Sequence, residues 1–528
     1  MQFPGLKTNS SNGRHRAVKR LLPYAGTLAI AGMLLAGCSG TSTSGSHSGG
    51  TITVADNSAP STLNPVGAGN GPDLSYQELA YASLIQQDPH GKLVPGLAKS
   101  WGYVGSDNKK FELTLRANMK FADGEPITAK AVAASLNYFA AKGTGPSASA
   151  FHLMHATADG ALKVVLTTTQ SNPVIPSLLS PYFLAGNVIA PKGLNNKKEL
   201  GTKTFGAGPY VLDNSQTVTG DHYTFVPNAN YYDQSQIHYK SFTVKVISDT
   251  SSVVQALRSG QVSVGTGDVT TVGAAKSAKL TVLHKPSTWD GAFIIDRTGE
   301  TTPALASLKV RQALNYAVDR SAITKAVFAP YGTTTDQPNT PGQDAYDPAL
   351  ESKYSYNPTK AKQLLAEAGY SDGFTIKWAY PSFENVTAKV VQAMAADYNA
   401  IGIKTELTGA ANISEFLTDL RSKQYGLWSF AWGGQSQYAN TAQVWLAGGE
   451  INPFGQVPDG LAEAFDKYTT ASASDSVAAA QAVQAVLVNQ AVSVPVSKFD
   501  TIVFHNTKVK GVALQDDGLL NNEIYWHD

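Results

Sequence analysis

The stretch from residue 357 to residue 432 constrains the fold most, because its hydrophobic residues alternate between helical and strand spacing. Asn357-Pro358 is a typical helix start, and Gly369 and Gly402 are typical helix ends. The expected elements, in order, are a helix over 358–368, a strand over 374–380, a helix over 386–398, a strand over 403–407, a helix over 413–420 and a strand over 425–432. This β-α-β-α-β order predicts an α/β fold whose parallel sheet has right-handed crossovers.

Candidate binding residues follow the carboxyl ends of these strands, where ligands of open α/β sheets lie. Trp432 offers a flat apolar wall with one N–H donor, and the two glycines after it would let a ligand approach the backbone. The predicted ligand-binding residues are Trp432, Gly433, Gly434, Gln435, Tyr380 and Phe383. The alternative is that Trp432 packs in the core, which is where we expect Trp428.

The amino-terminal segment has the order of a secretory signal. Five basic residues lie in the first 20, no acidic residue precedes Asp56, and Leu21 to Leu35 is mostly apolar but short for a membrane span. Cys38 is the only cysteine of the 528 residues, so it can form no internal disulfide. Leu35-Ala36-Gly37-Cys38 resembles the lipobox of bacterial lipoproteins, which implies a signal peptide over 1–37 and lipidation of Cys38. An incidental thiol in an ordinary leader is the alternative.

Composition beyond the leader indicates a large globular body on a tether. Residues 39–50 contain only Ser, Thr, Gly and one His, so 38–50 is expected to be a flexible tether. Five of the 41 basic residues lie in the leader, so the rest of the chain has 36 basic residues against 40 acidic ones. This lack of excess positive charge disfavours nucleic acid as a partner. Hydrophobic content of 42% and this length predict two or three domains.

Short segments spread in order along the chain carry a family resemblance. They are Pro60 to Pro65, 93–101 (LVPGLAKSW), 111–116 (FELTLR), 120–129 (KFADGEPITA), 205–210 (FGAGPY), 230–232 (NYY), 310–320 (VRQALNYAVDR) and 361–370. Together they resemble the family 5 solute-binding proteins of ABC importers, the oligopeptide, dipeptide and nickel-binding group.

The resemblance implies a periplasmic-binding-protein-like α/β fold with two lobes, a hinge and an additional domain. The implied domains are a discontinuous domain I (51–77, 205–284 and 498–528), domain II (78–204) and domain III (285–497, the second lobe). It also implies a monomer without cofactor or covalent chemistry. That monomer would be lipid-anchored at the extracytoplasmic face of the cell membrane, would enclose its ligand by hinge closure and would deliver it to ABC permease subunits.

One departure from the family pattern concerns the ligand. In the peptide-binding members, an aspartate three residues after the tryptophan pairs with the peptide's amino group, whereas this chain has Gln435. A neutral amide can bond an ammonium but supplies no opposite charge. A peptide is the first interpretation, and a sugar or a nickel or other metal chelate stays open.

Three motifs suggest other chemistry. Residues 369–373 match the G-x-S-x-G pattern of serine hydrolases, but a helix is expected before the serine and a strand after it, the reverse of a nucleophile elbow. We therefore disfavour a cell-envelope serine hydrolase. Residues 106–109 (SDNK) are expected to form a hairpin loop rather than a penicillin-binding site. His152 and His155 have a spacing that could hold a metal, although a surface or packed pair is favoured.

Overall fold

The computed structural model describes residues 49–69, 73–88, 90–144, 148–433, 436–449, 451–472 and 474–515, which belong to one compact unit that begins at His47. Cys38, the leader and most of the predicted tether lie outside the described residues, as do Gly434 and Gln435. Among the helices of the described part, none combines the length and the apolar character that crossing a bilayer requires.

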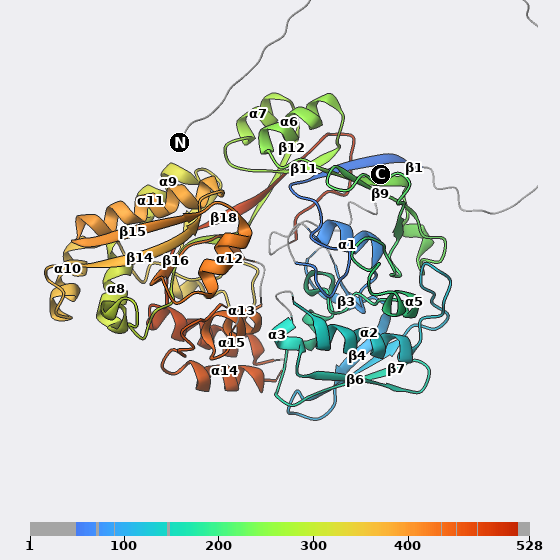
Figure 1. Ribbon diagram of the computed structural model, residues 1–528, viewed down its shortest axis with the longest axis horizontal. Coiled ribbons are helices and arrows are strands. Elements are labelled where there is room, and N and C mark those ends of the chain that lie inside the picture. Colours follow the sequence, from blue (N-terminus) through green and yellow to red (C-terminus); the bar gives the residue numbers. More distant parts are fainter. Residues whose placement is uncertain are drawn as a thin grey trace, which may run out of the picture. The chain divides into compact units, whose positions relative to one another are not determined.

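Twelve strands of the described residues form one mixed sheet (Figure 1). Their order is β15 (Ile403–Ala410), β14 (Phe374–Pro381), β16 (Leu427–Trp428), β12 (Thr281–Ile294), β18 (Ser493–His505), β11 (Val264–Gly267), β1 (Gly49–Asp56), β10 (Tyr239–Val246), β9 (His222–Pro227) and β8 (Tyr210–Leu212), with β13 (Gly332–Thr334) beside β18 and β17 (Trp432–Gly433) beside β12. β14 is parallel to both β15 and β16, and β1 is parallel to β10 and β11, whereas the other pairs are antiparallel.

The long antiparallel pair β12–β18 joins the two halves of this sheet. On one side of the pair lie β14, β15 and β16, and on the other lie β11, β1 and β10. The pairing shifts register twice, between Pro286 and Thr288 and between Asp290 and Gly291. At Gly291 a Cβ would lie 2.2 Å from the carbonyl oxygen of Val494, so only glycine allows this approach. Such bulges bend a strand pair locally.

A second, four-stranded antiparallel sheet lies between β1 and β8 in the sequence. Its order is β4 (Ala98–Tyr103), β5 (Lys110–Leu115), β7 (Lys163–Thr168) and β6 (Met154–Asp159), and β2 (Ile85–Gln87) pairs separately with β3 (Leu93–Pro95). Phe111, Leu113 and Leu115 are buried, as their alternation predicted. Helix α2 (Ala129–Lys142) packs on β6 and β7, and the Thr128 hydroxyl caps it by accepting from the Ala131 N–H.

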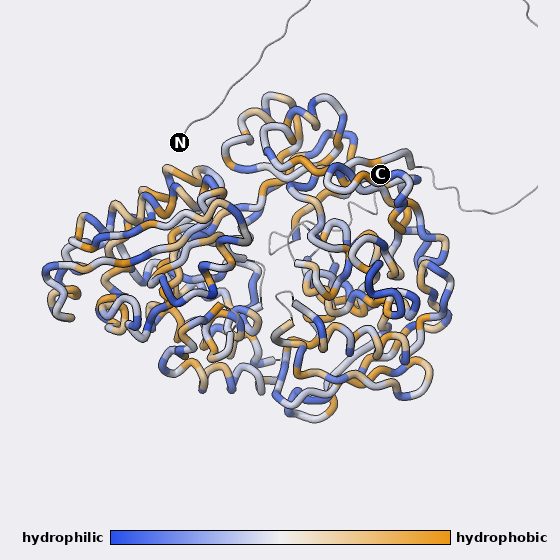
Figure 2. Tube along the Cα trace, in the orientation of Figure 1, coloured by the Kyte–Doolittle hydropathy of each residue, from blue (hydrophilic) through white to orange (hydrophobic). Residues whose placement is uncertain are grey.

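The predicted β-α-β-α-β stretch is confirmed except at its end. It contains α10 (Pro358–Glu367), β14, α11 (Asn385–Ala400), β15 and α12 (Ile413–Arg421). Ile376 and Trp378 of β14 are buried in a core with α8 (Leu308–Ala317), α9 (Arg320–Val327), α10 and α11, and Phe416 of α12 belongs to a different core. In Figure 2, hydrophobic and hydrophilic residues alternate along these helices, as expected for helices with one buried face.

The prediction of one continuous strand over 425–432 is wrong. Leu427 and Trp428 form β16 beside β14, and the chain then turns so that Trp432 and Gly433 form β17 beside β12. The local alternation could not reveal this change of partner.

The remaining helices and turns complete the described fold. They are α1 (Leu74–Ala80), α3 (Ala148–Phe151), α4 (Ile175–Leu178), η1 (Pro181–Phe183), α5 (Pro191–Asn195), η2 (Gln234–Gln236), α6 (Thr250–Ser259), α7 (Val272–Ser277), η3 (Pro303–Ala306), η4 (Pro348–Leu350), α13 (Gln437–Asn440), the π-helical turn η5 (Thr441–Trp445), α14 (Leu461–Thr469) and α15 (Ser476–Asn489).

Candidate ligand-binding cavity

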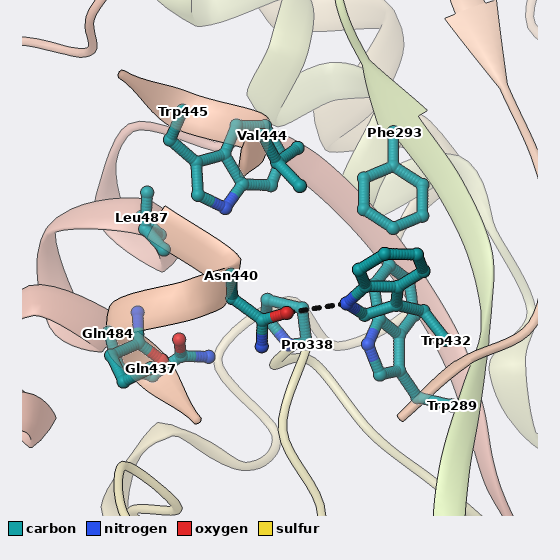
Figure 3. A pocket seen from close by; sticks show the side chains of 10 residues that line it. All are labelled: Trp289, Phe293, Pro338, Trp432, Gln437, Asn440, Val444, Trp445, Gln484 and Leu487. Carbon is teal, nitrogen blue, oxygen red and sulfur yellow. Dashed lines mark hydrogen bonds between the residues drawn. The ribbon is translucent and has the colours of Figure 1, made fainter. Parts of the chain in front are cut away.

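A small cavity lies between β12, β17 and the helical segments that follow residue 436 (Figure 3). Its volume is about 10 Å³. The lining residues are Trp289, Phe293, Pro338, Trp432, Gln437, Asn440, Val444, Trp445, Gln484 and Leu487. Trp432, the centre of the sequence prediction, is therefore in the wall of this cavity.

The aromatic wall results from the pairing of β17 with β12. Trp432 is the register partner of Trp289, so the two indoles come from adjacent strands. The indole N–H of Trp432 donates to Asn440 Oδ1 at 2.5 Å, which fixes the orientation of its ring. Phe293 contacts Trp289 with ring centroids 4.7 Å apart and Trp445 with centroids 5.9 Å apart. The result is a set of flat apolar surfaces from three segments of the chain.

The opposite side of the cavity is a network of amide side chains. Asn339 Nδ2 donates to Gln437 Oε1 at 2.9 Å and to Gln484 Oε1 at 3.0 Å. Gln437 Nε2 in turn donates to the hydroxyl of Thr441 at 3.1 Å. All four of these side chains are buried. The network gives the cavity polar groups without net charge.

Two buried donors of the wall have no hydrogen-bond partner among the described residues. They are Nε1 of Trp289 and Nε2 of Gln484, and both side chains are fully buried. A buried polar group without a partner costs about 1–3 kcal/mol relative to a satisfied one. Buried polar groups in native proteins are normally satisfied, so these two need an explanation.

No charged side chain lines the cavity within the described ranges, which omit Gln435. Two charged groups lie behind the wall. The Arg297 guanidinium lies 5.2 Å from the Trp445 ring and donates to Gln456 and to the carbonyl of Ile294, and its burial lowers its pKa to about 9. Asp344 accepts from the Gln437 N–H and from the Tyr468 hydroxyl, and burial raises its pKa.

The structure brings only one of the described predicted residues, Trp432, into the cavity wall. Gly433 lies beside it in β17, where a Cβ would approach the carbonyl oxygen of Ser287 to 2.1 Å. Tyr380 packs against the core of α8 to α11, and Phe383 is 42% exposed after the end of β14. Trp428 is fully buried, as expected.

The sequence reasoning missed Trp289, Asn440 and Gln484. The Asp290-Gly291 pair after Trp289 suggests a turn, whereas the structure continues β12 through it. Gln484 had a detectable signal, because it shares a helical face with Ala480 and Leu487 and is therefore a buried amide on an apolar helix. Asn440 had none, because its role depends on the side chain of Trp432.

The three motifs that suggested other chemistry lie in turns, loops and strands of the fold. Residues 369–373 lie between the end of α10 and the start of β14, so the serine is in a turn without the strand-then-helix context of a nucleophile elbow. Asn108 lies in the loop between β4 and β5, as predicted, and its Nδ2 donates to the carbonyl of Thr469 at 3.0 Å. His152 Nδ1 lies 2.6 Å from the carbonyl of Ala140, and the described residues contain no cluster of three metal-binding side chains.

Comparison with known protein families gives one match that covers most of the chain. The description of that family is "Bacterial extracellular solute-binding proteins, family 5 Middle", and the match covers residues 92–453. Curated relatives include the glutathione-binding protein GsiB of Salmonella choleraesuis, which is 29% identical over 376 residues, covering 68% of this chain and 69% of that protein. GsiB of Escherichia coli O157:H7 is 28% identical, and the match covers the same percentages of the two chains.

Solved structures give the same fold. The binding protein AgaA from A. tumefacien R10, in complex with agropinic acid, has a TM-score of 0.77 and 21% identity, covering 90% of this chain and 98% of that one. NikZ from Campylobacter jejuni with Ni(L-His) has a TM-score of 0.76 and 20% identity, covering 90% and 99%. DppA from Helicobacter pylori with the peptide STSA has a TM-score of 0.76 and 19% identity, covering 91% and 98%. The predicted α/β fold, of the periplasmic-binding-protein type with two lobes, is thus confirmed.

Proposed function

This chain belongs to the family 5 extracellular solute-binding proteins of ABC transporters, and we propose that it captures a small solute in the cavity beside Trp432 and delivers it to a membrane permease. The observation that carries this proposal is the cavity wall, which combines aromatic faces with buried, unpaired N–H donors. The names of its relatives mention glutathione, a peptide, a nickel–histidine complex and agropinic acid, so membership alone does not choose the ligand.

The mechanism that we propose is capture, closure and delivery, without covalent chemistry. The two bulges in β12–β18 are suited to a hinge, because both lie in the strand pair that joins the halves of the sheet. The hydrogen bond from Asn108 to Thr469 ties the loop between β4 and β5 to the end of α14. This contact supports a closed arrangement, in which the predicted domains II and III (78–204 and 285–497) meet.

Replacing Trp432 by alanine should weaken ligand binding about 10- to 100-fold, which corresponds to about 1.4–2.8 kcal/mol. The variant should still fold, because the indole is only half-buried and lies in a two-residue strand. A thermal-shift screen over peptides, sugars and nickel chelates would supply the ligand, and calorimetry would measure its affinity. Trp101→Ala removes a half-buried indole from β4 and is the matched control. Equal ligand affinities in Trp432→Ala and Trp101→Ala would contradict the assignment of this cavity as the ligand-binding site.

We also propose that Cys38 carries a lipid that holds the protein at the extracytoplasmic face of the membrane. Support comes from the lipobox-like Leu35 to Cys38 and from the polar segment after it. Cys38→Ala should therefore abolish lipidation and move the protein from the membrane fraction to the medium or soluble fraction. Fractionation and metabolic labelling with a fatty acid would measure this, with Ser39→Ala as control. Membrane association that persists in Cys38→Ala would refute the anchor.

A further inference from the structure

The cavity wall presents flat apolar faces at close range. The indoles of Trp289 and Trp432 come from paired strands, and Phe293 and Trp445 extend the same surface. Figure 3 shows Trp289, Trp432 and Phe293 on one side, the amides of Gln437 and Gln484 on the other and Asn440 between them, with Trp445 beside Val444. A ligand between them would need an apolar face for the rings and polar atoms along its edge for the amides.

The unpaired donors define the polar atoms that such a ligand must offer. Nε1 of Trp289 can only donate, and Nε2 of Gln484 is a donor because the Oε1 of the same amide accepts from Asn339. Both side chains belong to the cavity lining and are fully buried. A ligand oxygen that accepts from each would remove two unsatisfied groups at once.

The described part of the wall offers no charged group that could pair with a strongly charged ligand end. Among the described residues, the lining contains aromatic, aliphatic and amide groups only. The two charged groups behind the wall already have partners: Arg297 donates to Gln456 and Ile294, and Asp344 accepts from Gln437 and Tyr468. A buried ammonium or carboxylate without an opposite charge is strongly unfavourable.

We propose that the ligand end held here is an uncharged ring that carries hydroxyl and ether oxygens, which is the chemistry of a sugar unit. This inference rests on the proposed function and names its class of solute. The C–H face of such a ring stacks on an indole, and its oxygens accept from Trp289 and Gln484. Since the cavity holds only about 10 Å³, a ring can enter only when the half-buried Trp432 gives up its hydrogen bond to Asn440 and moves. Binding therefore changes the environment of an indole.

The experiment is a thermal-shift and tryptophan-fluorescence titration of the full chain with two sets of probes. One set contains neutral disaccharides (cellobiose, maltose, xylobiose and lactose), and the other contains dialanine with free ends and nickel–histidine. At least one disaccharide should raise the melting temperature by several degrees and change the fluorescence, while the charged probes should do neither. If no disaccharide shifts the melting temperature, the inference is wrong. If dialanine or nickel–histidine binds instead, and Trp432→Ala abolishes that binding, the proposed solute capture beside Trp432 is supported and the inference of a sugar is wrong.

Two pairs of variants test the wall itself with the disaccharide that binds. Trp289→Phe keeps a flat ring but removes the N–H, and should weaken binding at least fivefold. Trp428→Phe is its control, because Trp428 also has a buried, unpaired N–H but does not line the cavity. Gln484→Glu places a carboxylate in the wall and should weaken binding at least tenfold, whereas Gln481→Glu on the same helix should not. Unchanged affinity in both Trp289→Phe and Gln484→Glu would overturn the assignment.

Discussion

Replacing Arg320 by methionine should lower the free energy of unfolding by about 3–5 kcal/mol, because it leaves the buried carboxylate of Asp336 without its counter-charge. The two side chains are 7% and 3% exposed, and Arg320 Nε lies 2.8 Å from Asp336 Oδ1. The same guanidinium donates to the carbonyls of Pro495 and Asn315 at 2.7 and 2.8 Å. One side chain therefore ties α9 to β18 and to the end of α8, and its loss removes all of these bonds.

Chemical denaturation of the apo protein would measure this effect. The matched control is Lys467→Met, which breaks an ion pair whose side chains are 71% and 75% exposed and should leave the midpoint unchanged. The double variant Arg320→Met with Asp336→Leu removes both charges and should recover part of the lost stability. A single variant as stable as the wild type would show that the pair is not essential to this core.

Asp290→Asn should stabilise the protein at pH 8 and have little effect at pH 4. Asp290 is fully buried in β12, where its carboxylate accepts from the Thr387 hydroxyl at 2.8 Å and from the Gly291 N–H at 2.7 Å. Burial raises its pKa from 3.8 to about 7, and the charge of Glu384 acts in the same direction. The Thr387 hydroxyl also lies 3.2 Å from Glu384, whose pKa burial likewise raises.

The sign of the pH dependence follows from these pKa values. Between pH 4 and pH 7 the folded state keeps a proton on Asp290 that the unfolded state releases, so the free energy of unfolding falls as the pH rises. The fall ends above pH 7 and amounts to at most about 4 kcal/mol. An asparagine keeps the bond from Gly291 and can donate to Thr387, so it should flatten this slope. Urea unfolding between pH 4 and pH 8 would measure it, with the exposed Asp372→Asn as control. Parallel slopes in Asp290→Asn and the wild type would contradict the prediction.

The sequence predicted the elements that depend on local spacing. Ile376 and Trp378 alternate, and the apolar face of α11 has helical periodicity, so β14, α11 and β15 follow from neighbouring residues alone. The pairing of Trp432 with Trp289 could not be predicted in this way, because it depends on two strands that are far apart in the sequence. The same holds for Gln484, whose free N–H depends on how Asn339 and Gln437 share their bonds.

The ligand was harder to predict than the fold for a physical reason. Fold class follows from many residues that repeat one pattern, whereas ligand chemistry depends on a few atoms that converge in space. The replacement of an aspartate by Gln435 was the only sequence sign of an uncharged ligand, and Gln435 lies outside the described residues. The domain boundaries at 77, 204, 284 and 497 stay predictions.

The place of β18 in the sheet has a consequence for how the chain folds. β18 is the last strand of the described residues, and it lies between β12 and β11, the inner strands of the two halves. During synthesis each half can gather its own strands early, but the bridge between them is missing until residues 493–505 have been made. We therefore expect the insertion of this strand, which is a long-range step, to come late in folding and to be slow compared with local pairing. A nascent chain that lacks this strand would have two unpaired inner edges, which are sites for aggregation.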